Sequence, residues 1–187
     1  WEDEKEAVLK EISKLKFPMF VKPAHLGSSI GITKVKDESE LQNALEVALH
    51  YDDKILVEEG VNNLIEVTLP IIGNEIPRAA LVERPLNKGD LFDFDCKYMH
   101  GGKKSAGANS SYSEIPANIG DKLTERVIAL GKKVYEIVGC SGIARVDFLI
   151  DSTTKEVYVI EVNTMPGSLY HHNWKKSGIS GVELVTK

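Results

Sequence analysis

The polar residues of one predicted hairpin, at residues 142–167, carry the clearest chemistry in this chain. Two β-branched runs joined by a short polar hinge are typical of an antiparallel pair of strands. Arg145 and Asp147 are two residues apart on the first run, and Glu161 and Asn163 are two residues apart on the second. Side chains alternate along a strand, so each pair lies on one face. In the register that the short hinge suggests, two carboxylates, an amide oxygen and a guanidinium share one patch.

The composition of this patch allows two interpretations. Carboxylate and amide oxygens are the ligands that a hard cation such as Mg²⁺ prefers. Alternatively, Asp147 is the partner of Arg145 in a structural ion pair, and the two interpretations are compatible. Residues 164–167 end the second strand and begin a loop beside the patch.

A second group of residues, near the start of the chain, has the composition of an anion site. Lys22 ends a short predicted strand and faces a loop of small residues at 27–31. Small residues let backbone N–H groups approach an anion closely, and a lysine adds a point charge. The loop differs from a P-loop because no Gly-Lys-Ser/Thr follows, and a plain turn is the alternative.

Length and composition restrict the class of protein. The 187 residues are 42% hydrophobic and 27% charged, as in an ordinary globular protein with one sizeable core or two small lobes. The net charge of −5 gives no electrostatic support to nucleic-acid binding, and no apolar run approaches the roughly 18 residues of a membrane helix. Cys96 and Cys140 lack metal or redox spacing, so we expect a reduced protein of the cytoplasm. The chain starts at Trp1 and not at Met, which favours a piece of a longer protein.

Hydrophobic spacing predicts the elements that would position these groups. Helices are expected at 1–16, after a cap at Asp37, at 119–138 and in the C-terminal tail, and strands at 19–22, 32–35, 54–59, 65–72, 76–84 and 92–98. Residues 99–114 are rich in Gly, Ser, Lys and Asn, a composition that predicts a mobile surface loop. Helices and antiparallel hairpins alternate irregularly, which predicts an α+β fold and not a parallel doubly wound sheet.

Several motifs follow one another in a fixed order, at 20–23 with 27–31, then at 57–61, 95–98, 142–148 and 161–167. In order and rough spacing they resemble the ATP-grasp superfamily and, within it, the D-alanine–D-alanine ligase family. The resemblance implies two α+β lobes, with mostly antiparallel sheets, that grip ATP between them. It also implies a linker helix at 1–16, a small lobe at 17–84, a large lobe at 85–187 and an N-terminal substrate domain that this chain lacks.

The resemblance assigns roles around the nucleotide. Lys22 and Lys97 resemble the two lysines that hold the ATP phosphates, where cations stabilise charge on the transferring oxygens. Glu58 would accept a hydrogen bond from the adenine amino group. The other nucleotide-binding positions are Ser29, the backbones of Glu59 and Val61 at the adenine edge, and Glu66 as the only candidate for the ribose.

The predicted hairpin would hold the metal and the transferring group. Asp147, Glu161 and Asn163 resemble the ligands of two Mg²⁺ ions, or of Mn²⁺, with Glu161 bridging them. Three side chains suffice for two ions when ATP and water supply the other ligands. Arg145 would lie over the acyl phosphate and the tetrahedral oxyanion.

The remaining assignments concern the substrates. Ser28 and Tyr98 match catalytic positions around the attacking amine, and Gly167 and Ser168 would receive the substrate carboxylate. Residues 168–174 depart from the family pattern because this loop is shorter than usual. The adjacent histidines in it, at 171 and 172, are interpreted as loop residues and not as metal ligands.

The implied reaction joins a carboxylate to an amine. ATP would phosphorylate the carboxylate of D-alanine or another amino acid, and an amine would attack the acyl phosphate, in peptidoglycan precursor synthesis. Because acyl phosphates hydrolyse, loops 27–31 and 99–114 are expected to exclude water. We expect a homodimer of the full-length protein, without nucleic acid or membrane. The alternatives are an ATP-grasp ligase for other substrates, or a fragment that binds Mg-ATP without catalysis.

Overall fold

The computed structural model describes residues 4–86 and 113–186. The strand predicted at 92–98, with Lys97 and Tyr98, and most of the predicted loop lie outside these described residues. The described chain forms two compact units, of residues 4–60 and of residues 61–86 with 113–186.

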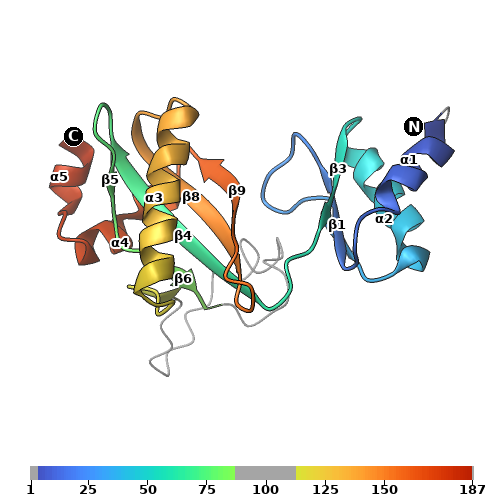
Figure 1. Cartoon of the computed structure of the whole chain (residues 1–187). Coiled ribbons are helices and arrows are strands. Elements are labelled where there is room, and N and C mark those ends of the chain that lie inside the picture. The colour runs from blue at the N-terminus through green and yellow to red at the C-terminus, as the bar shows by residue number, and fades with distance from the viewer. Residues whose placement is uncertain (1–3, 87–112, 187) are drawn as a thin grey trace, which may run out of the picture. The chain divides into compact units, whose positions relative to one another are not determined.

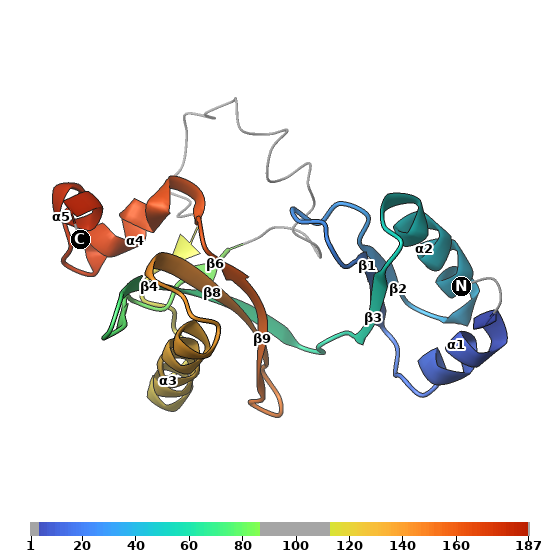
Figure 2. The ribbon, with the colours of Figure 1, turned by 90° about the horizontal axis from the view of Figure 1, so that it is seen from above.

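The first unit is a three-stranded antiparallel sheet covered by helices. Its strands are β1 (Met19–Pro23), β2 (Thr33–Val35) and β3 (Ile55–Glu59), in the order β2-β1-β3. Helices α1 (Lys5–Ile12) and α2 (Glu38–Tyr51) lie on one side of this sheet (Figure 2). The core between them consists of Ile12, Met19, Val21, Val35, Leu41, Ala44, Leu45 and Ala48.

The two helices of this unit differ in how well the sequence predicts their ends. The Asp37 side chain accepts a hydrogen bond of 2.9 Å from the N–H of Ser39, and this cap starts α2 where the sequence predicts it. By contrast, α1 ends at Ile12 and not at residue 16. The N–H of Lys16 instead donates to a carboxylate oxygen of Glu59 at 3.0 Å, because the chain has already turned towards β3.

The second unit is built on a four-stranded antiparallel sheet. Its strands are β4 (Leu64–Gly73), β5 (Arg78–Ala79), β8 (Gly142–Asp151) and β9 (Val157–Asn163), in the order β5-β4-β8-β9. Strands β4 and β8 pair over ten residues each. Their alternate residues form a buried apolar face of Val67, Leu69, Ile71, Ala144, Val146, Phe148 and Ile150. The opposite face carries the polar residues of both strands.

Helix α3 (Asp121–Ile137) covers the apolar face of this sheet (Figure 1). Gly131 lets the helix lie close to the strands, because a Cβ atom there would lie 2.6 Å from Cδ2 of Leu69 and 3.3 Å from Cζ of Phe148. The Tyr135 hydroxyl lies 2.5 Å from the carbonyl oxygen of Gly73 and 2.9 Å from that of Gly142. The helix is thereby fixed to the ends of both central strands.

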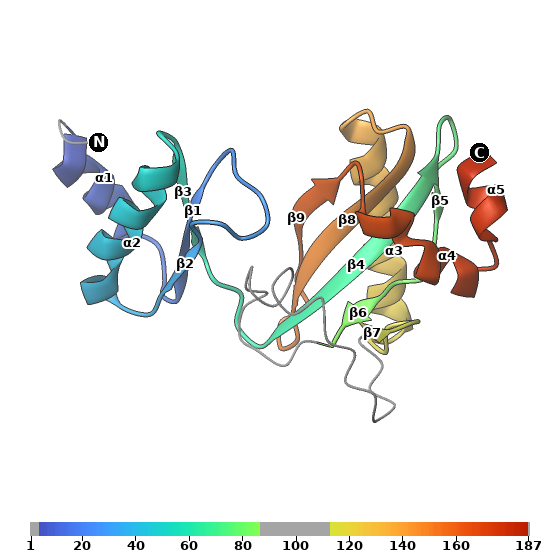
Figure 3. The ribbon, with the colours of Figure 1, turned by 180° about the vertical axis from the view of Figure 1, so that it is seen from behind.

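Two short helices pack on the opposite face, towards β5. The tight turn η3 (Gly167–Tyr170), with a left-handed backbone at residues 168–170, leads directly into α4 (His171–Lys176), which is followed by α5 (Gly181–Thr186). Figure 3 shows α4 and α5 on the side of the sheet away from α3. Their core consists of Ile72, Ala80, Trp174, Ile179 and Leu184. Polar side chains of the central strands, among them Arg145 and Asp147, lie on this same face.

The boundary between the units differs from the predicted lobe boundary at residues 84 and 85. Residues 61–86 belong to the second unit because β4 pairs with β8 along its whole length. The strand predicted at 76–84 is interrupted, since only β5 and β6 (Arg84–Pro85) are regular. Residues 113 and 114, predicted as loop, form β7 (Ser113–Glu114), which pairs with β6. Among the described residues, no helix is long and apolar enough to span a membrane.

Candidate active site

The hairpin of β8 and β9 brings the four predicted residues onto one face. Arg145 pairs with Asn163, and Asp147 pairs with Glu161, so all four side chains lie on the side of the sheet away from α3. The register shifts after Asp147 through a β-bulge, as Phe148 lies opposite Val159. A bulge re-aims the side chains beside it. The patch predicted from the alternation of residues is confirmed.

Asp147 is the centre of the contacts within this patch. Arg145 donates from Nε to Oδ1 at 2.6 Å and from Nη2 to Oδ2 at 2.5 Å, and Asn163 donates from Nδ2 to Oδ2 at 2.9 Å. The Arg145 and Asp147 side chains are each 20% exposed. Burial opposes the guanidinium charge, but the hydrogen bonds and charge of Asp147 outweigh it and raise the pKa of Arg145. The guanidinium therefore stays cationic across the physiological range.

The donor set of the patch fits Mg²⁺. Because Asn163 uses its amide nitrogen towards Asp147, its amide oxygen is oriented away from that carboxylate. Glu161, on the exposed strand opposite Asp147, adds a second carboxylate. Two carboxylates and an amide oxygen form an all-oxygen set of the kind that hard cations accept. The ion pair with Arg145 and a metal role for Asp147 are therefore compatible.

The first unit holds a separate group of predicted residues. Nζ of Lys22 lies 2.6 Å from Oε2 of Glu58, on the neighbouring strand. Their side chains are 22% and 47% exposed, respectively. The residue predicted to hold phosphate and the residue predicted to read adenine thus form one ion pair. A surface pair of this kind contributes at most about 1 kcal/mol to folding.

The small-residue loop after β1 has an unusual backbone. Ser28, Ser29 and Gly31 all have positive φ, at 56°, 62° and 73°. A Cβ at Gly31 would lie 2.8 Å from Cγ of Pro23, so glycine is required there for packing as well as for conformation. The N–H groups of Ile30 and Ile32 donate to the carbonyl oxygens of Gly27 and Ser29, so the loop is a series of tight turns.

The start of this loop is anchored by Asp52, which caps the end of α2. Its carboxylate accepts hydrogen bonds from the His25 N–H at 2.7 Å and the Lys54 N–H at 3.1 Å, and Nδ1 of His25 lies 3.0 Å from both oxygens. The contact with the His25 ring is the main reason that the pKa of Asp52 lies far below its usual range, and the two N–H donors lower it further.

The depressed pKa of Asp52 makes a pH-dependent stability expected for the Asp52→Asn variant. A carboxyl group with a lowered folded-state pKa stabilises the fold above its unfolded pKa of about 3.9, and this contribution is lost as the pH falls. Asp52→Asn should therefore be less stable than the wild type at about pH 7, and the difference should shrink towards about pH 2.5. Urea denaturation at both pH values measures it. An equal difference at the two pH values would contradict the assignment.

Comparison with known proteins decides the family. The family model described as D-ala D-ala ligase C-terminus matches residues 1–187. This chain belongs to the D-ala D-ala ligase C-terminus family. It is 40% identical over 189 residues to D-alanine--D-alanine ligase B of Clostridium tetani, covering 99% of this chain and 50% of that protein. It is 42% identical over 184 residues to the D-alanine--D-alanine ligase of Thermoanaerobacter sp., covering 96% of this chain and 49% of that protein.

Solved structures agree with the family. The VanG D-Ala:D-Ser ligase from Enterococcus faecalis matches with a TM-score of 0.80 and 31% identity, over 98% of this chain and 52% of that chain. The D-alanine-D-alanine ligase from Coxiella burnetii matches with a TM-score of 0.71 and 26% identity, over 97% and 46%. The α+β class and the ATP-grasp fold expected from the sequence are confirmed. The chain spans about half the length of the relatives it matches.

Within this ligase-family chain, the predicted site residues fall into two groups. Those of the first unit are Lys22, Ser28, Ser29, Glu58 and Glu59. Those of the second unit are Val61, Glu66, Arg145, Asp147, Glu161, Asn163, Gly167 and Ser168. Glu66 pairs with Leu149, which places it on the polar face of the sheet with Asp147. Lys97 and Tyr98 lie outside the described residues.

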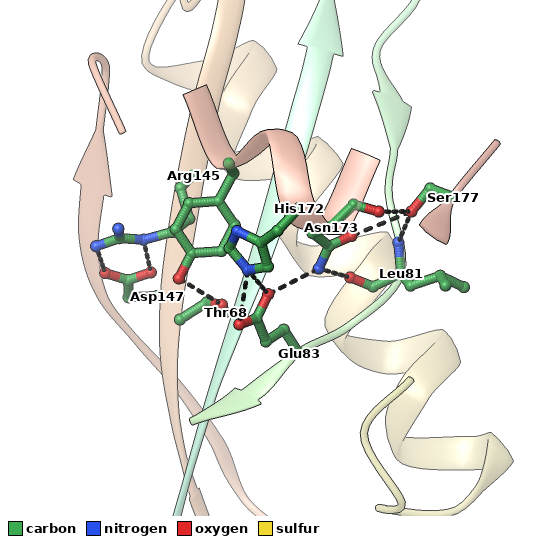
Figure 4. A network of polar contacts seen from close by, with 9 residues as sticks. Thr68, Leu81, Glu83, Arg145, Asp147, His172, Asn173 and Ser177 are labelled. Atoms are coloured by element: carbon green, nitrogen blue, oxygen red, sulfur yellow. Dashed lines mark hydrogen bonds and ion pairs between the residues drawn. The ribbon is translucent and has the colours of Figure 1, made fainter. Parts of the chain in front are cut away.

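Several polar residues beside the ligase-family hairpin were not predicted. His172 was interpreted as a loop residue, whereas it lies in the first turn of α4 and pairs with Glu83. Glu83, Tyr170 and Asn173 complete the same group of contacts (Figure 4). In the sequence, Glu83 is one charged residue of the strand predicted at 76–84. Its partner, His172, lies 89 residues further along the chain, so no local pattern indicates the contact. Only the fold identifies these residues.

Proposed function

We propose that this chain is the ATP-binding part of a ligase that joins the carboxylate of one D-alanine to the amine of a second. The observation that carries the proposal is the single face shared by Arg145, Asp147, Glu161 and Asn163 in a chain of this family. The relatives named above are D-alanine–D-alanine ligases. The product would serve peptidoglycan precursor synthesis in the cytoplasm, and we propose a homodimer of the full-length protein.

Arg145 would supply positive charge at the reacting group. Its guanidinium is fixed along one edge by Asp147, so it is preorganised before charge develops on the acyl phosphate and on the tetrahedral oxyanion. Asp147, Glu161 and Asn163 would hold Mg²⁺, which offsets phosphate charge when bound. Mn²⁺ suits the same oxygen donors.

A second group of predicted residues would bind the nucleotide. Lys22 would pair with the ATP phosphates, and Glu58, released from Lys22, would accept from the adenine amino group. The backbones of Glu59 and Val61 would read the adenine edge. Ser29 and Glu66 would contact the phosphates and the ribose, and Lys97 would be the second phosphate-binding lysine.

The substrate side involves residues near both loops. Ser28 and Tyr98 would contact the attacking amine, and Gly167 and Ser168 would receive the substrate carboxylate. Gly167 has open space around the position of a Cβ atom. Since the VanG relative is a D-Ala:D-Ser ligase, D-serine is a specific alternative acceptor to D-alanine.

The test is ATP-dependent phosphate release by the full-length protein with D-alanine, D-serine and other amino acids. Release that requires D-alanine, with a D-alanyl product seen by mass spectrometry, supports the proposal. Turnover only with other amino acids favours an ATP-grasp ligase of different specificity. Mg-ATP binding by calorimetry without turnover supports a nucleotide-binding module, and absence of both binding and turnover overturns each function.

Lys22→Ala is expected to weaken ATP binding. A charge-assisted contact to phosphate is worth about 1.5–3 kcal/mol, so the Kd for ATP should rise roughly tenfold or more. The free energy of unfolding should change by less than about 1 kcal/mol, because the pair with Glu58 is partly exposed. Calorimetry with Mg-ATP measures the affinity.

The matched control for this variant is Lys36→Ala, at an exposed lysine just before α2. Its ATP affinity should equal that of the wild type. Equal affinities for ATP in Lys22→Ala and Lys36→Ala would show that Lys22 does not bind the nucleotide.

A further inference from the structure

A buried carboxylate anchors the segment next to Arg145 (Figure 4). Glu83 is 4% exposed, and its backbone forms hydrogen bonds of 2.8 and 3.0 Å with Thr68 on β4. Nε2 of His172 lies 2.9 and 3.0 Å from its two carboxylate oxygens, and Asn173 donates to one of them at 3.0 Å. A buried carboxylate is costly without such partners. Glu83 therefore fixes the first turn of α4 against the sheet.

Tyr170 contacts both His172 of this anchor and Arg145 of the polar patch. Its ring centroid lies 4.8 Å from that of His172, with an angle of 48° between the planes. Cζ of Arg145 lies 5.1 Å from the Tyr170 ring centroid, within the range of a cation–π contact. The Tyr170 hydroxyl is 3.5 Å from Oγ1 of Thr68. The tyrosine ring thus contacts both the imidazole that pairs with Glu83 and the guanidinium.

The backbone that presents this ring is held in an unfavourable conformation. Ser168, Leu169 and Tyr170 have consecutive φ values of 51°, 50° and 54°. Three successive non-glycine residues in the left-handed region persist only where their surroundings impose it. The contacts of Tyr170 with His172, Thr68 and Arg145 do so together with the packing of Leu169 on the core of α4 and α5.

We propose that Tyr170 is a positioning residue for Arg145, held against the guanidinium by the Glu83–His172 pair. Asp147 fixes one edge of the guanidinium through two hydrogen bonds, and Cζ of the guanidinium lies over the Tyr170 ring. Together they restrict the group in two directions. The inference rests on the proposed function, in which Arg145 must meet developing charge. Misplacement of such a group by about 1 Å can cost 10²-fold in rate.

Kinetics of the full-length protein separate positioning from binding. Tyr170→Leu should lower kcat by roughly 10- to 100-fold while the KM for ATP changes less than about twofold, because the loss is confined to the transition state. Tyr170→Phe keeps the ring and should recover kcat to within about threefold of the wild type. Equal losses in the two variants, or wild-type kcat in Tyr170→Leu, would overturn the proposal.

A pair of histidine variants tests the anchor. His172→Asn should lower kcat about tenfold, since it loosens the ring that positions Arg145. The matched control is His171→Asn, because His171 precedes it in the same helix but contacts Gly181, with its Cδ2 3.2 Å from the position of a Cβ there. This control should have the kcat of the wild type. Similar kcat values in the two variants would show that the anchor does not act on the site.

A measurement that does not depend on turnover separates the positioning role of Tyr170 from the proposed ligase function. Hydrogen exchange of the Arg145 Nε–H, assigned by its loss in Arg145→Lys, should be slow in the wild type and in His171→Asn. It should be about tenfold faster in Tyr170→Leu and in His172→Asn, since this proton is donated to Asp147. Unchanged exchange overturns the positioning role whether or not the protein is active. An inactive wild type with accelerated exchange in the variants overturns the proposed function alone.

Discussion

Glu161→Ala is expected to abolish ATP-dependent phosphate release in the full-length protein while the fold is retained. Glu161 lies on an exposed strand opposite Asp147, so its removal opens no cavity in the core. It does remove one of the two carboxylates in the proposed metal set. Metal-based stabilisation of phosphoryl transfer is worth several kcal/mol, which corresponds to a rate loss of about 10³-fold or more.

The matched control for this prediction is Glu156→Ala on the same hairpin. Glu156 is a surface carboxylate whose partner is Arg126, at 2.9 Å. This variant should retain wild-type turnover. Mn²⁺ binding, followed by electron paramagnetic resonance with ATP present, should weaken in Glu161→Ala and be unaffected in the control. Normal turnover in Glu161→Ala would refute the metal assignment.

Phe148→Ala is expected to have the largest effect on stability. Phe148 is 1% exposed and packs against α3 where Gly131 brings the helix close. Truncating a buried phenylalanine costs about 3–5 kcal/mol, a large part of a typical free energy of unfolding of about 5–15 kcal/mol. Asp147 directly precedes Phe148 in β8. Loss of this packing should therefore also loosen the polar patch around Asp147.

Trp174 provides the measurement, since it is fully buried in the second unit. In a Trp1→Phe background, its fluorescence during urea denaturation reports that unit separately. The control is Val159→Ala, opposite Phe148 and 37% exposed, which should cost less than about 1 kcal/mol. A loss in Phe148→Ala as small as in this control would contradict the packing described for α3.

The hairpin of β8 and β9 was predicted well because the residues that define it are close together in the chain. Alternation of polar and apolar residues in β8 and β9, with a short hinge, determines both pairing and face. The pairing of β4 with β8 joins residues about 80 positions apart, and no local pattern reports it, so the predicted lobe boundary fell after residue 84. The same limit explains Glu83, whose role depends on distant His172.

Helix boundaries show a second limit of local patterns. The apolar spacing of residues 1–16 continues past Ile12, but the helix ends there and the chain passes through turns that bring the Lys16 N–H to Glu59. At Asp37 the start of α2 was predictable, because the cap is formed by side chains two residues apart. The shared face of Asp147, Glu161 and Asn163 was predictable because alternation along a strand is also a local pattern, whereas the contacts of Tyr170 were not.

Because η3 leads directly into α4, the length of the Gly167–Tyr170 loop and the rotation of α4 about its axis are linked. Tyr170 is the last residue of the one element and His171 the first residue of the other. A residue that joins the first turn of an α-helix advances the side chains after it by about 100°. With no connecting residue to absorb an insertion, lengthening Gly167–Tyr170 would either push the loop outward or rotate His172 away from Glu83. The length of the loop beside the substrate and the orientation of Arg145 are therefore expected to change together in this family.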